Sequence, residues 1–129
     1  MPMRAPSITD VQAIAEAEIA AIPQTLRRQV GNIVVQVVDL PDEEVCQAME
    51  LESPFDLLGL YMGEALTERN VSAPTPEPDM VQLYRRSLLN YWCESEAALA
   101  NVVRYVLLHE IGHHFGYSDE EMDALQGEP

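Results

Sequence analysis

The chain has 129 residues, of which 47% are hydrophobic, so we expect residues 1–129 to form a single domain with its own core. The 22 acidic residues outnumber the 7 basic ones, and the formal net charge of −15 repels phosphate backbones and anionic lipid headgroups. Nucleic acids and membrane surfaces are therefore poor partners. No apolar stretch approaches a membrane span and no signal peptide is recognisable, so we predict a cytoplasmic protein.

The first predicted element is an amphipathic helix over residues 7–22, because apolar side chains recur there at helical spacing. Ser7 or Thr9 can cap the start of this helix, and Pro23 ends it. Residues 26–29 can add one more helical turn.

Three strands are predicted in the middle of the chain. The β-branched run at 33–38 predicts a strand that is buried on most of both faces. A short helix is expected over 42–51, and a second strand over 57–62. The prolines within 67–79 indicate a surface loop, and the alternating residues 80–84 predict a third strand.

The last part of the chain is predicted to be helical. Residues 85–92 form a short helix or turn, and 95–115 carry the longest helical pattern, which Ser95 can cap and Gly116 can end. A capping box then opens a final helix over 118–126. The core residues of the long helix are predicted to be Leu99, Val102, Val103, Val106 and Leu107. Strands clustered between helices indicate an α+β fold, with a small mixed sheet packed on the long helix.

The two cysteines, Cys46 and Cys93, are too few for a disulfide framework. Neither belongs to a C-x-x-C pair, which argues against a thiolate metal site. We expect both to be small buried hydrophobic side chains.

The segment His-Glu-Ile-Gly-His at 109–113 carries the chemistry of the sequence. Residues four apart on a helix differ by about 40° around the axis, so His109 and His113 project from one face on successive turns. Two imidazoles so placed can both bind a metal at about 2.0–2.1 Å. Glu110 lies about 60° from His113, where its carboxylate can reach a water on the metal and act as a general base.

A catalytic zinc site needs a third protein ligand and an open fourth position. The candidates are the carboxylates that follow the helix: Asp119, Glu120, Glu121 and Asp123. Gly116 lets the backbone turn sharply back beside His113, which favours Asp119, three residues past the glycine. Asp119 can also stabilise the first turn of the last helix, and the two roles are compatible.

The pattern His109-Glu110-x-x-His113-x-x-Gly116-x-x-Asp119 resembles the zinc motif of the metzincins, which has a third histidine where this chain has Asp119. Residues 109–122 resemble more closely a family of very small bacterial zincin-like proteins, described as minimal metalloproteases, whose motif has aspartate there. The resemblance implies a zincin-like domain, a zinc ion held by two histidines and an aspartate, and peptidase activity.

Other residues near the motif can assist. His114 lies about 100° from His113 around the helix, so packing or a hydrogen bond is expected of it rather than ligation. Tyr117 could donate a hydrogen bond to a developing oxyanion, the alternative being a half-buried tyrosine.

The third predicted strand and its end can also contribute to a cleft. One of Tyr84, Arg85 and Arg86 could polarise a substrate carbonyl, although solvated side chains at a sheet edge are the better explanation of all three. If residues 80–84 form an edge strand, they can pair with an extended peptide.

We therefore predict a zinc-dependent metallopeptidase that acts on a peptide or protein substrate. Zn²⁺ binds His109, His113 and Asp119, and lowers the pKa of a water in the fourth position towards about 7. Glu110 accepts the proton of this water and returns it to the leaving amine. Three alternatives stay open: a zinc-binding domain without turnover, a non-peptide hydrolase, and a packed helix that binds no metal.

Overall fold

The computed structural model describes residues 5–22, 24, 33–62, 79–114 and 120, and for His113 and His114 the backbone. The described elements are α1 (Ile8–Ala20), β1 (Ile33–Val38), α3 (Glu43–Ala48), the 3-10 helix η1 (Pro54–Asp56), β2 (Gly59–Met62), β3 (Asp79–Tyr84), α4 (Arg85–Glu94) and α5 (Leu99–His114). The turn predicted at 26–29 and, residue 120 aside, the helix predicted at 118–126 lie outside the described residues. So does the loop predicted over 67–79, except for Asp79, which begins β3.

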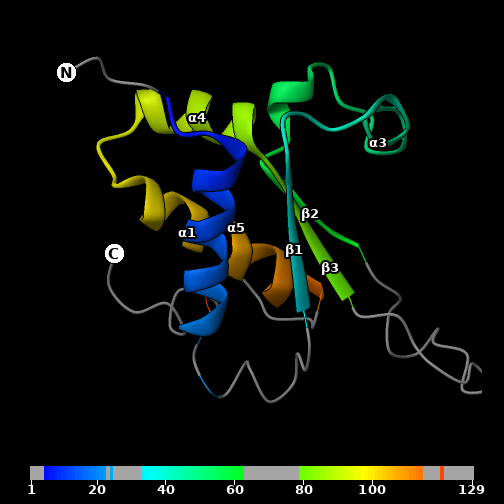
Figure 1. Ribbon diagram of the computed structural model, residues 1–129. Helices are drawn as coiled ribbons and strands as arrows, with labels where there is room; N and C mark the ends of the chain where they lie inside the picture. Colours follow the sequence, from blue (N-terminus) through cyan, green and yellow to red (C-terminus); the bar gives the residue numbers. More distant parts are fainter. Residues whose placement is uncertain (1–4, 23, 25–32, 63–78, 115–119, 121–129) are drawn as a thin grey trace, which may run out of the picture.

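The three strands form one small mixed sheet in the order β1-β3-β2. β1 pairs parallel with β3, and β2 pairs antiparallel with β3 on its other side. α1 packs on β1 and on α5, while α5 packs on β2 and β3 (Figure 1). The predicted α+β fold, with a small mixed sheet on a long helix, is confirmed.

The core lies between the sheet and the pair α1 and α5. All five residues predicted as the core of the long helix are buried. The strands supply Val35, Val37, Val81 and Leu83, and α1 supplies Val11 and Ala15. α5 is the longest described helix, and none of the described helices combines the length and hydropathy needed to cross a membrane.

The burial predicted for β1 was wrong for one of its two faces. Val35 and Val37 are buried, but Val34 is 43% exposed and Gln36 is exposed as well. Successive side chains of a strand point to opposite faces, and α1 and α5 cover only the face of Val35 and Val37. The β-branched composition therefore reflects strand propensity rather than burial on both sides.

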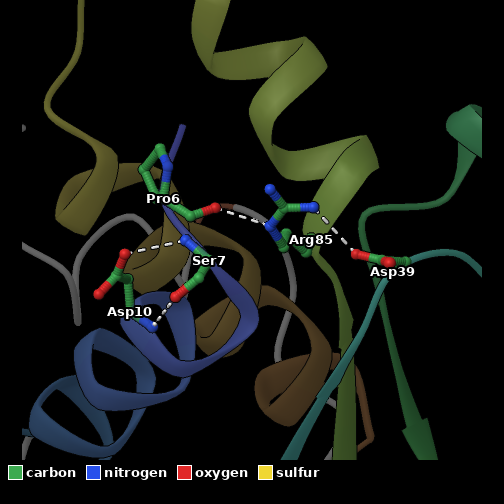
Figure 2. Close-up of polar contacts among 5 residues, drawn as sticks. All are labelled: Pro6, Ser7, Asp10, Asp39 and Arg85. Atoms are coloured by element: carbon green, nitrogen blue, oxygen red, sulfur yellow. Dashed lines mark hydrogen bonds and ion pairs between the residues drawn. The ribbon is translucent and has the colours of Figure 1, made fainter. Parts of the chain in front are cut away.

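The start of α1 is fixed by a capping box, and Ser7 rather than Thr9 is the cap. Ser7 Oγ accepts from the Asp10 backbone N–H at 3.1 Å, and Asp10 Oδ2 accepts from the Ser7 N–H at 2.9 Å (Figure 2). Arg85 then ties this end of the helix to the sheet. Its Nε donates to the Pro6 carbonyl at 2.6 Å and its Nη1 donates to Asp39 Oδ1 at 3.0 Å, so one side chain joins α1, β1 and α4.

The long helix begins later than predicted, at Leu99, and Ser95 does not cap it. The Ser95 hydroxyl instead donates to the Trp92 carbonyl at 3.0 Å, and the Trp92 indole donates to the Ala97 carbonyl at 3.1 Å. These bonds close the connection between α4 and α5. Ser95 therefore ends one helix rather than starting the next, because its side chain satisfies an orphan carbonyl of α4.

The environments of the cysteines differ from the prediction. Cys46 is partly buried in α3, and Cys93 is exposed on α4; both are free thiols. Cys93 is the second-last residue of α4 and is exposed although Leu89, one turn before it, packs against the core.

Candidate metal and peptide site

The motif helix α5 comes very close to the edge strand β2 at Gly59. A Cβ atom at this position would lie 2.8 Å from Val106 Cγ1 and 3.0 Å from Leu83 Cδ2. Real Cβ contacts are essentially never shorter than 3.0 Å, so the residue at 59 has to be a glycine for the helix to lie where it does. This approach sets the distance between β2 and the next turn of α5, which carries the motif.

Glu110 reaches β2 from that next turn. Its Oε1 accepts a hydrogen bond of 3.2 Å from the backbone N–H of Tyr61, two residues after Gly59. The contact joins residues 49 positions apart in the chain. The predicted general base is thus half-buried and fixed against the outer strand of the sheet.

His109 and His113 lie in one uninterrupted helix, because α5 runs regularly to His114. Their spacing therefore places them about 40° apart around the axis and about 6 Å apart along it, as two zinc ligands on one helix require. The His109 imidazole is stacked on Tyr105, with ring centroids 4.1 Å apart and the ring planes at 29°. A donor set of two imidazoles on successive turns, one held by a neighbouring ring, fits a zinc ion.

Tyr61 also engages the central strand. Its hydroxyl donates to Asp79 Oδ2 at 2.6 Å, and Asp79 is only 6% exposed. Tyr61 pairs with Val81, so Asp79 is its diagonal neighbour on the same face of the sheet. Glu110, Tyr61 and Asp79 thus form a continuous chain of contacts from α5 through β2 to β3.

The remaining predicted site residues lie outside the described residues: Gly116, Tyr117, Asp119, Glu121 and Asp123. Glu120, which is described, is exposed. Within the part of the chain that the structure describes, no three histidine, cysteine, aspartate or glutamate side chains come together as a metal cluster. The assignment of Asp119 as third ligand stays a prediction.

The strand order bears on the roles predicted for the third strand, as a peptide-pairing edge and as a source of residues that polarise a carbonyl. β3 is the central strand and not an edge, so it has no side available for a peptide; β2 is the strand next to the motif. β3 runs opposite to β2, so its last residue lies beyond Gly59, at the far end from Tyr61 and Asp79. Arg85 binds Pro6 and Asp39 there, and Arg86 lies 5.6 Å over the Phe55 ring.

Tyr84, the third of these candidate residues, is fully buried. Its hydroxyl donates to Gln82 Oε1 at 2.8 Å, and burial raises the pKa of Tyr84 to about 12. The side chain is therefore part of the packing at the end of the sheet rather than of a cleft.

Four residues around the site were not recognised from sequence: Gly59, Tyr61, Asp79 and Tyr105. Tyr105 had a local signal, because it precedes His109 by four residues, the spacing of neighbours on a helix. No local sequence signal marks Gly59, Tyr61 or Asp79, because their roles depend on which strand lies at the edge of the sheet and which residues face each other on neighbouring strands.

Known proteins resemble this chain in family and in fold. The model of a family described as zincin-like metallopeptidase matches residues 30–128. No curated protein matches the chain. Among solved structures, a conserved hypothetical protein from Thermo thermophilus is similar, with a TM-score of 0.53 and 18% identity over 84% of this chain and 94% of that one. At this identity the likeness shows a shared fold.

Proposed function

The chain belongs to the zincin-like metallopeptidase family, and on this premise we propose that it is a zinc-dependent peptidase whose general base is Glu110. One observation carries the proposal: the hydrogen bond between Glu110 Oε1 and the backbone N–H of Tyr61. This bond holds the carboxylate of the zinc motif beside an edge strand, where an extended peptide can be aligned by backbone pairing.

The proposed zinc ligands are His109, His113 and Asp119. Zinc, when bound, supplies Lewis acidity, which acidifies a coordinated water and polarises the carbonyl to be attacked. Tyr105 holds the ring plane of His109 by stacking and so limits the orientations of that imidazole.

Glu110 has two oxygens, and the bond to β2 engages Oε1. The carboxylate accepts a proton from the attacking water and returns it to the nitrogen of the leaving amine. In this proposal the edge strand β2 aligns an extended substrate backbone through outward groups other than the Tyr61 N–H, which Glu110 occupies, because no other strand lies on its outer side among the described residues.

The test is zinc content by elemental mass spectrometry, together with a screen of a peptide library, on the wild type, Glu110→Gln and Asp119→Ala. We expect one zinc per chain in the wild type and in Glu110→Gln, and less in Asp119→Ala. Peptide hydrolysis should fall by about 10²-fold or more in Glu110→Gln, since a general base contributes that much.

Two results would contradict the proposal. A wild type that holds no metal after zinc addition and removal of excess would leave a packed helix with a coincidental motif. Full zinc occupancy without hydrolysis of any peptide would favour the alternative of a zinc-binding domain without turnover.

A further inference from the structure

Tyr61 is bonded at both its backbone and its side chain to groups on other elements. Its N–H donates to Glu110 Oε1 at 3.2 Å, and its hydroxyl donates to Asp79 Oδ2 at 2.6 Å. The first bond reaches the motif helix α5 and the second reaches the central strand β3. The tyrosine therefore links the proposed base to the middle of the sheet.

The register explains why this N–H is available to α5. The Tyr84 N–H donates to the Leu58 carbonyl at 3.1 Å, so the bonded pairs of the antiparallel ladder fall at every second residue, at Leu58, Leu60 and Met62. Gly59 and Tyr61 are the residues between them, and their N–H groups point away from β3. Glu110 accepts the outward N–H of Tyr61, which no strand of the described sheet could satisfy.

The hydrogen bond from the Tyr61 hydroxyl to Asp79 is important because Asp79 is buried. A carboxylate that is 6% exposed is unfavourable unless donors compensate for its lost hydration, and the Tyr61 hydroxyl is one of them. A hydrogen bond to a charged acceptor is short and strong, and 2.6 Å falls in that range. The hydroxyl end of the Tyr61 side chain is thus bonded to β3. The Tyr61 backbone is also held to β3, through the ladder bonds of its neighbours Leu60 and Met62.

We propose that Tyr61 and Asp79 are positioning residues for Glu110: the anchored tyrosine holds its own N–H at the place where the carboxylate of the base must lie. The inference rests on the proposed function of Glu110. A base that is fixed in advance by a backbone donor does not have to be reoriented during the reaction, which is what preorganisation contributes. Neither residue touches the reacting atoms; Asp79 acts on Tyr61, and Tyr61 acts on Glu110.

Amide hydrogen exchange of zinc-loaded protein, followed by NMR, tests this without any substrate. The amide of residue 61 should exchange slowly in the wild type although it faces the outer side of an edge strand. It should exchange rapidly in Glu110→Ala. In Tyr61→Phe and in Asp79→Ala we expect exchange at residue 61 to be faster by about tenfold, the effect of weakening one hydrogen bond.

Two controls separate positioning from loss of structure. In Asp79→Asn the amide oxygen still accepts from the tyrosine hydroxyl, so protection at residue 61 should remain within about threefold of the wild type. The amide of Leu60, which lies in the ladder to β3, should be unchanged in every variant.

The inference is overturned if residue 61 exchanges equally fast in the wild type and in Glu110→Ala, or equally slowly in the wild type and in Tyr61→Phe. It is also overturned if Leu60 loses protection together with residue 61, because Asp79 would then hold the whole strand rather than one amide. These readouts do not depend on turnover. A protein that shows the expected exchange but hydrolyses no peptide would disprove the proposed function and leave the positioning role standing.

Discussion

Single residues in this protein acquire their chemistry from the neighbours that the fold gives them. Glu110 accepts from a backbone donor of β2, His109 stacks on Tyr105, and Tyr84 is buried with its hydroxyl on Gln82. The burial of Tyr84 links its titration to the stability of the fold. Burial is the main cause of the raised pKa of Tyr84, and nearby negative charge, Asp42 first, adds to it.

The raised pKa of Tyr84 predicts a loss of stability at high pH. The folded value of about 12 exceeds the ordinary 10.0, so the unfolded chain loses this proton first. The contribution is fully present below pH 10 and is lost as the pH rises towards 12, by about 2–3 kcal/mol, since one unit corresponds to about 1.4 kcal/mol. Urea unfolding at pH 8, 10 and 11 should show this decline in the wild type and a smaller one in Tyr84→Phe. Equal declines in the two proteins would contradict the assignment.

At the scale of elements, both edges of the small sheet are engaged by side chains from helices. Gln12 of α1 pairs with β1 as a strand would: its Nε2 donates to the Val35 carbonyl at 2.8 Å and its Oε1 accepts from the Val37 N–H at 3.1 Å. On the other edge, Glu110 of α5 accepts a hydrogen bond from the Tyr61 N–H of β2. Each contact satisfies particular backbone groups that the sheet leaves unpaired: the Val35 carbonyl and Val37 N–H on β1, and the Tyr61 N–H on β2.

Gly59→Ala should disturb the contact between α5 and β2. The new methyl group would lie 2.8 Å from Val106 Cγ1, a stiff β-branched side chain that is only 4% exposed. We expect a loss of about 1–3 kcal/mol in the free energy of unfolding, as for other overpacked cores. Denaturant unfolding measures this change.

A double-mutant cycle provides the control for this prediction. Val106→Ala alone leaves a cavity, but together with Gly59→Ala it removes the atom that clashes, so the double variant should lose less stability than the sum of the two single ones. Strict additivity would indicate that the two residues are not in contact.

At the scale of the whole molecule, the net charge of −15 opposes compaction through self-repulsion. A bound divalent cation would reduce this repulsion and would also link the folded state to metal binding. Free zinc at 100 times its Kd would stabilise the folded state by about 2.7 kcal/mol if it binds only the native protein. The proposed site therefore has a consequence that can be measured without a substrate.

Removing zinc with a chelator should lower the Tm of the wild type, measured by differential scanning calorimetry at fixed ionic strength. His109→Ala, which lacks one proposed ligand, should show the same Tm with and without the chelator. A wild-type Tm that does not respond to chelation would count against a zinc site at the end of α5.

The sequence by itself determined the elements and the motif, because these depend on short-range patterns. Strand propensity at 33–38, helical periodicity in the long helix and the four-residue spacing of His109 and His113 are all local. The first two predicted the α+β class, and the resemblance of residues 109–122 to zincin-like proteins predicted the family. The tertiary structure decided which strand lies at the edge, which face of β1 is open, and that Tyr61 and Asp79 lie beside Glu110. These contacts join residues far apart in the chain through strand order and register, and no local pattern encodes either.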